Sequence, residues 1–89
     1  MIEEVLNQRQ TTHGSFTKNA ETAQMLKYFV KQGDNYIDMP VVQREALDMI
    51  LHKIARIVNG DPNYIDNWID ICGYSQLVIE EVKSYEEPT

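Results

Sequence analysis

Residues 43–60 form an amphipathic pattern that constrains the fold more than any other part of the chain. Positions three and four residues apart are apolar on one side of a helical projection and polar on the other, which is typical of an α-helix that buries one face. The segment therefore predicts a helix with a polar ridge opposite its core side. The apolar positions are Leu47, Ile50, Leu51, Ile54, Ile57 and Val58, and the polar ridge consists of Glu45, Asp48, His52, Arg56 and Asn59.

A second amphipathic segment begins directly after the first and extends to about residue 85. The dipeptide Asn59-Gly60 predicts a left-handed cap at the end of the first helix, and Asp61-Pro62 predicts the start of the next one, with Asp61 as the cap and Pro62 in the first turn. We therefore predict an antiparallel hairpin. We expect the apolar side of the second helix to contain Tyr64, Trp68, Ile71, Cys72, Val78, Ile79 and Val82, and its polar side to contain Asp66, Asp70, Tyr74 and Glu81.

The rest of the chain predicts one further main helix, over residues 17–31, with an N-cap at Ser15 or Thr17. Residues 1–10 indicate a short helical turn or a flexible arm, and residues 86–89 a frayed acidic tail. Gly73 lies inside the last helix at a cost of about 1 kcal/mol relative to alanine, so we expect a helix or a ligand to approach it closely. The prediction is a single all-α domain over residues 1–89, with three main helices and a core of Leu47, Ile50, Ile54, Trp68, Ile71 and Val78.

Composition limits the classes of partner. The formal net charge is -6 and the eight basic residues are scattered, which argues against a nucleic-acid binder; the acidity suits a divalent cation or a basic partner, and equally serves solubility. The single Cys72 excludes an intrachain disulfide, and no segment is apolar enough to span a bilayer. We expect a cytoplasmic protein, and at 89 residues a homo-oligomer, because so short a chain leaves apolar side chains uncovered.

Acidic pairs on the two hairpin helices have the spacing of ligands for a hard cation. Glu45 and Asp48 are three residues apart, and Asp66 and Asp70 four; carboxylates at such steps on facing helices hold Mg²⁺ in helical bundles. The same spacing is common on solvated helices, which is the alternative interpretation. His52 is a candidate general base that Asp48 would orient, or a structural residue. The candidate catalytic set is thus Glu45, Asp48 and His52.

Basic and aromatic residues near these pairs suggest a phosphate-bearing ligand. Lys53 and Arg56 have the charge to clamp a phosphate, and Tyr74 the ring to stack on a base. His13 lies in a loop before a helix N-terminus, which offers free N–H groups to an anion, although a loop anchored by a buried Phe16 is the plainer account. The candidate ligand-binding set is His13, Lys53, Arg56, Asn67 and Tyr74.

Five stretches of the chain, residues 13–16, 43–50, 52–57, 60–62 and 66–74, together resemble a family of small phage and prophage proteins of uncharacterised function. More distantly, the layout is similar to the all-α MazG-like nucleotide pyrophosphohydrolases, which hold magnesium with acidic residues on two helices. That resemblance implies Glu45, Asp48 and Asp70 as ligands. The chain departs from the pattern because it lacks the Glu-Glu-x-x-Glu signature and has Asn67 where the Glu-x-x-Asp motif has glutamate.

Three functions follow from these observations. The first is a Mg²⁺-dependent nucleotide pyrophosphohydrolase in which Glu45, Asp48, Asp66 and Asp70 hold the metal. The second is a non-catalytic phage sponge that sequesters a nucleotide immune signal of the host. The third is an acidic interaction protein that modulates a host protein. Calorimetry against nucleotides separates the first two from the third.

Overall fold

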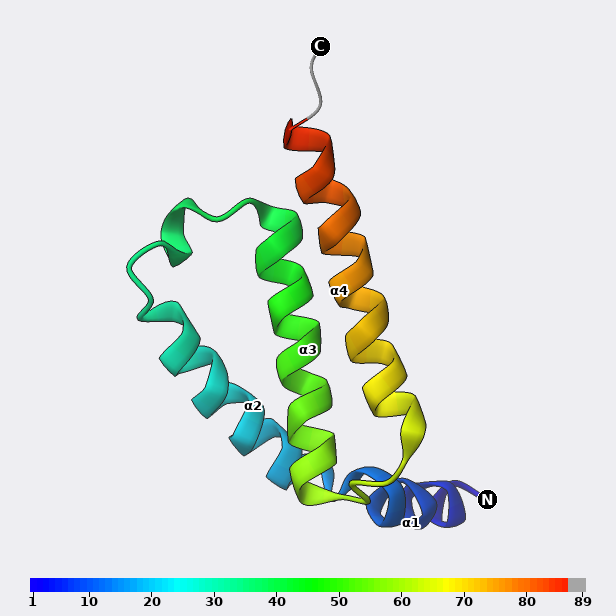
Figure 1. Cartoon of the computed structure of the whole chain (residues 1–89). Helices are drawn as coiled ribbons and strands as arrows, with labels where there is room; N and C mark the ends of the chain where they lie inside the picture. Colours follow the sequence, from blue (N-terminus) through cyan, green and yellow to red (C-terminus); the bar gives the residue numbers. More distant parts are fainter. Residues whose placement is uncertain (87–89) are drawn as a thin grey trace.

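The computed structural model describes residues 1–86, in which all regular structure is helical (Figure 1). The elements are α1 (Ile2–His13), α2 (Phe16–Lys31), the short 3-10 helix η1 (Tyr36–Asp38), α3 (Val41–Asn59) and α4 (Ile65–Glu86). The all-α prediction is confirmed, but residues 1–86 contain four α-helices rather than three. The tail expected over residues 86–89 lies, beyond Glu86, outside the described residues.

The additional helix is α1, in the region for which a short turn or an arm was predicted. Its sequence contains no glycine or proline, and Glu3 and Glu4 in its first turn favour helix formation through the helix dipole. It ends at Gly14, whose φ of 83° is the left-handed conformation that glycine adopts without strain. No residue of α1 is buried, so this helix forms without a buried apolar face.

The helix ends agree with the sequence in part. Ser15 caps α2, because its Oγ accepts a hydrogen bond from the backbone N–H of Lys18 at 3.1 Å. Gly60 follows α3 as expected, but its φ of -123° is extended rather than left-handed. Asp61 does not cap a helix at Pro62 either. Its Oδ1 accepts from the N–H of Asn63 at 2.9 Å, which forms a turn and delays the start of α4 to Ile65.

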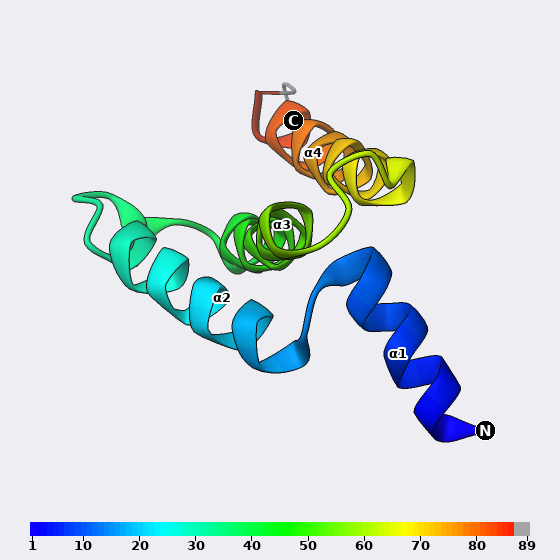
Figure 2. The same ribbon diagram turned by 90° about the horizontal axis from the view of Figure 1, so that it is seen from below.

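The long helices form a single layer (Figure 2). α3 lies in the middle and packs against α2 on one side and α4 on the other, and α3 and α4 make the antiparallel hairpin that the sequence predicts. α1 lies across the end of the layer at which α3 finishes and α4 begins (Figure 1). The molecule is consequently elongated, with extents of 54 × 25 × 22 Å. None of the described helices is long and apolar enough to cross a membrane.

The single layer explains why the predicted core is wrong. The buried apolar side chains are few, and most of them are alanines. Trp68, which was expected in the core, is 51% exposed. Its Nε1 donates a hydrogen bond to the carbonyl of Pro62 at 2.9 Å. Cys72 is exposed as well. The other predicted core residues are only half-buried, since domains bury helices fully by stacking a second layer on them. The buried apolar residues are Ala23, Ala46, Leu51, Ala55 and Ile57.

Two glycines bring the ends of α1 and α3 into contact. A Cβ atom on Gly14 would overlap the backbone of Asn59, and a Cβ on Gly60 would overlap the backbone of Thr12 and His13. The backbone N–H of Asp61 donates to the Thr12 carbonyl at 2.8 Å across this contact. The close approach therefore requires glycine on both segments.

Gly73 is different. A Cβ there would meet no heavy atom of the described chain within 4 Å, so the expected approach of a helix to Gly73 is not made within the described part of the molecule.

Candidate functional site

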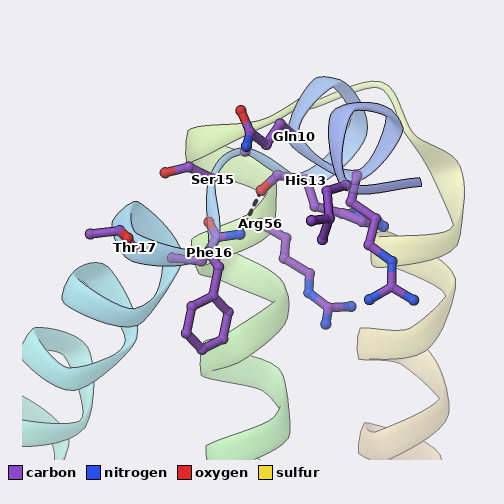
Figure 3. A pocket seen from close by; sticks show the side chains of 10 residues that line it. Gln10, His13, Ser15, Phe16, Thr17 and Arg56 are labelled. Carbon is purple, nitrogen blue, oxygen red and sulfur yellow. Dashed lines mark hydrogen bonds between the residues drawn. The ribbon is translucent and has the colours of Figure 1, made fainter. Parts of the chain in front are cut away.

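The corner at which α1, α2 and α3 meet contains a pocket of about 420 Å³. Arg9 and His13 reach it from the last turns of α1, and Arg56 from the last turn of α3. Ser15, Phe16 and Thr17 contribute the start of α2 (Figure 3). Three side chains of basic character thus share one pocket in a chain whose net charge is -6.

A chain of amide hydrogen bonds fixes this corner. The Nδ2 of Asn59 donates to the Thr22 hydroxyl at 3.0 Å and to the Asn19 Oδ1 at 3.2 Å, and so ties the end of α3 to α2. The Nδ2 of Asn19 in turn donates to the His13 carbonyl at 2.7 Å (Figure 3). The last residue of α1 is thereby held against the first turn of α2, which positions His13 beside the pocket.

The pKa of His13 is sensitive to the positive charges around the pocket. Its ring packs edge-on against Tyr64 with centroids 5.2 Å apart, and its buried Nδ1 has no hydrogen-bond partner among the described residues. Burial lowers the pKa of His13 below its ordinary value, and the positive charges of Arg56, Lys53 and Arg9 lower it further. The neutral ring at pH 7 therefore lies in a field of three cations, which an anion would offset.

The start of α2 adds backbone donors and an aromatic ring. Ser15 satisfies the N–H of Lys18, whereas the first N–H groups of a helix have no partner within it and lie at the positive end of its dipole. Phe16 is 85% exposed, so the alternative of a loop anchored by a buried Phe16 is wrong. Its ring lies beside the side chain of Arg56 at the edge of the pocket (Figure 3).

Other predicted site residues make contacts elsewhere in the layer. Lys53 Nζ forms an ion pair with Asp70 Oδ2 at 2.8 Å, so Asp70 of the predicted polar side of α4 contacts α3 through a lysine outside the predicted ridge of α3. His52 Nε2 lies 3.1 Å from Lys27 Nζ, so Lys27 of α2 is the hydrogen-bond partner of His52. Burial and the charge of Lys27 lower the pKa of His52, while the charge of Asp48 opposes this shift.

The predicted metal ligands are dispersed. Glu45 and Asp48 line a shallow hollow of about 280 Å³ beside Arg44, near the start of α3, whereas Asp70 is paired with a lysine and Asp66 is exposed. Within residues 1–86, no three His, Cys, Asp or Glu side chains lie close enough together to hold a metal ion. The predicted set of Glu45, Asp48, Asp66 and Asp70 therefore does not fit Mg²⁺ as it stands.

Asn67 and Tyr74 complete the predicted ligand-binding set. Asn67 is 1% exposed, and its Oδ1 and Nδ2 are both without a hydrogen-bond partner in the described chain. Tyr74 lines a separate, mostly apolar pocket of about 430 Å³ with Met49 and Leu77. Of the five predicted residues, the corner pocket contains His13 and Arg56.

Arg9, Phe16 and Asn19 were not predicted as ligand-site residues from the sequence. Arg9 precedes His13 by four residues and therefore lies on the same face of α1; that spacing would have identified it had the helix been predicted. Asn19 is four residues after the N-cap of α2, and no pattern in the sequence shows that it bonds to a residue of α1.

The chain belongs to the family described as "Domain of unknown function (DUF6378)", whose model matches residues 2–82. No curated protein and no solved structure matches the chain. The matched range includes every residue that lines the corner pocket.

Proposed function

We propose that this member of the DUF6378 family binds a small phosphate-bearing ligand of the nucleotide class in the corner pocket. The observation that supports this most directly is the convergence of Arg9, His13 and Arg56 on one pocket beside a helix N-terminus. Clustered basic groups are costly in the absence of an anion, because like charges repel. Here burial lowers the pKa of His13, and the charges of Arg56 and Arg9 lower it further.

Each group has a distinct task in the proposed complex. The guanidinium groups of Arg9 and Arg56 have the planar geometry that pairs bidentately with phosphate oxygens. The N–H groups at the start of α2 add uncharged donors. The exposed ring of Phe16 offers a surface on which a base stacks, and a volume of about 420 Å³ is within the range of small-molecule sites.

The fate of the ligand is a separate question, with two answers suggested by the sequence. The distant likeness to MazG-like enzymes suggests Mg²⁺-dependent hydrolysis, and the likeness to small phage proteins suggests sequestration of a host nucleotide signal. We propose sequestration, since binding in the corner pocket requires only groups that already line it. Hydrolysis would additionally require carboxylates from outside this pocket, because its lining residues within 1–86 include neither Asp nor Glu.

Isothermal titration calorimetry tests the proposal with inorganic phosphate, nucleoside mono- and triphosphates and cyclic dinucleotides, each with and without Mg²⁺. Loss of a charge-assisted contact costs about 1.5–3 kcal/mol, so Arg56→Ala should weaken binding about tenfold or more. Lys31→Ala is the matched control, because it removes one positive charge at the opposite end of α2 and should leave binding unchanged. Phe16→Ala should weaken nucleotide binding and leave phosphate binding intact.

Two results would count against the proposed function. If no ligand of the panel produced heat, or if Arg56→Ala and Lys31→Ala bound equally well, the corner pocket would not be the site. Chromatography of the ligand after incubation then separates the two fates: unchanged nucleotide is the result expected for sequestration, and a Mg²⁺-dependent product would show hydrolysis.

A further inference from the structure

The two faces of the helical layer differ in chemistry. On α3, Leu47, Ile50, Ile54 and Val58 follow one another at steps of three and four, so they form one stripe along the helix. Leu47 and Ile50 line a groove of about 250 Å³ with Val78 of α4, which places the adjoining stripe of α4 on the same face. We call this side of the layer the apolar face. It contains Leu26 and Phe29 of α2, Leu47, Ile50, Ile54 and Val58 of α3, and Trp68, Ile71, Val78 and Val82 of α4.

The centre of the apolar face contains no charged side chain. The uncharged polar positions on its stripes are Thr22, Gln43 and Ser75, and the charged positions Lys18 and Glu86 lie near the start of α2 and at the end of α4. Other charged side chains of the same helices lie on the opposite side, where Lys53 pairs with Asp70 and Lys27 contacts His52. In a chain that carries 14 acidic and 8 basic residues, a face with an uncharged centre is a specific feature of the layer.

The apolar face is also incompletely buried. Phe29 is 67% exposed, Val58 64% and Trp68 51%, and the remaining apolar members are half-buried. The accessible surface of the chain is 6804 Å², whereas a compact monomer of 10.4 kDa exposes about 5,400 Å². Likewise the radius of gyration is 15.6 Å, against about 12 Å for a compact domain of this length. The chain therefore exposes about 1,400 Å² more than a compact monomer.

We infer that a second copy of this chain covers the apolar face, so that two single layers stack into one two-layer helical dimer. A stable interface of standard size buries about 800 Å² per partner, and the excess surface of each chain, to which the apolar face and the exposed helix α1 both contribute, is larger than this. Stacking also supplies the second layer that a helical domain needs to bury its core. The half-buried Leu47, Ile50 and Ile54 would then become interior.

The distribution of charge over the chain favours a second copy of it as the partner that covers the apolar face. Two chains of net charge -6 repel each other through any face that carries their acidic residues. The apolar face is the side of the layer on which two identical chains meet through an uncharged centre. A two-fold axis places the same stripe of each chain against its counterpart, as in an isologous interface.

The inferred dimer leaves the corner pocket open. Arg56 is two residues beyond Ile54 and therefore about 200° further around α3, on the opposite side of the layer. Each copy would keep its own pocket facing away from the interface. Dimerisation and ligand binding at the corner are thus independent, and either can fail without the other.

Size-exclusion chromatography with multi-angle light scattering tests the inference on the full chain at about 1 to 100 µM. Wild type should have twice the chain mass of 10.4 kDa, and its Tm should rise with protein concentration. Phe29→Glu and Val58→Glu should each give the monomer mass. Both side chains are largely exposed in the single chain, so neither substitution removes a core contact, and far-UV circular dichroism should show retained helix content.

Gln24→Glu is the matched control, because it adds the same charge to an exposed residue of α2 on the opposite side from Phe29; it should remain dimeric. A wild-type mass of 10.4 kDa throughout the concentration range would overturn the inference. So would a dimer that persists in both Phe29→Glu and Val58→Glu, since the two chains would then meet through a different face.

Discussion

Gly60→Ala tests the contact between α1 and α3 that shapes the corner pocket. The added Cβ would overlap backbone atoms of Thr12 and His13, and backbone cannot move aside as a flexible side chain does. Overpacking of this kind costs about 1–3 kcal/mol. For a chain of this length, a loss of about 2 kcal/mol lowers Tm by about 8–16 °C. We therefore expect Gly60→Ala to be clearly destabilised in thermal unfolding followed by circular dichroism.

Gly73→Ala is the internal comparison, since it adds the same methyl group where no described atom lies within 4 Å. A glycine inside a helix is about 0.5–1 kcal/mol less stable than alanine, so this variant should unfold at a higher temperature than wild type. Hydrogen exchange at the Asp61 amide, which donates to Thr12 across the contact, should accelerate in Gly60→Ala only. If Gly60→Ala unfolded at the wild-type temperature with a protected Asp61 amide, α1 would not dock on α3 as described. All samples are compared at one protein concentration.

Two further predictions concern the core and the histidines. Leu51 is 7% exposed, so Leu51→Ala should lower the free energy of unfolding in urea by about 2–5 kcal/mol, whereas Leu77→Ala at an exposed position should change it by less than about 0.5 kcal/mol. The pKa values of His13 and His52 are lowered from 6.5 in the folded chain, so the unfolded chain takes up these protons first as the pH falls. Stability should accordingly be intact above about pH 6.5 and decline below it. His52→Gln should decline less than wild type between pH 7.5 and about pH 5.5; parallel curves for the two proteins would contradict the lowered pKa of His52.

The amphipathic periodicity of residues 43–60 was sufficient to predict α3, its hairpin with α4 and the all-α class. It was not sufficient to predict which apolar positions are buried. Ile54 and Ala55 are adjacent, yet the small alanine is fully buried and the isoleucine is not, because α3 packs between two neighbours in one layer instead of against a core on one side. Periodicity identifies an apolar stripe, but it does not reveal whether the same chain supplies the element that covers it.

The candidate site was predicted in its parts rather than as a whole. His13 and Arg56 were both selected from the sequence, for separate reasons, and the structure brings them to one pocket. The link between them runs through Asn19 and Asn59, whose bonding partners depend on how α1 and α2 meet. Arg9 was missed because residues 1–10 were predicted as a short helical turn or a flexible arm, whereas α1 extends to His13. Contacts between segments distant in sequence are not encoded in local spacing.

The amide of Asn59 also has a consequence for the order of folding. Its bonds to Thr22 and Asn19 join residues 37 and 40 positions apart, whereas α3 and α4 are joined by residues 60–64 alone. Closing a long loop costs more chain entropy than closing a short one, and local contacts form faster than distant ones. The hairpin of α3 and α4 should thus assemble early, and the corner that contains the pocket should close last. A ligand that binds this corner would then stabilise the last part of the fold to form, because it would bind only molecules in which the slowest contact has already formed.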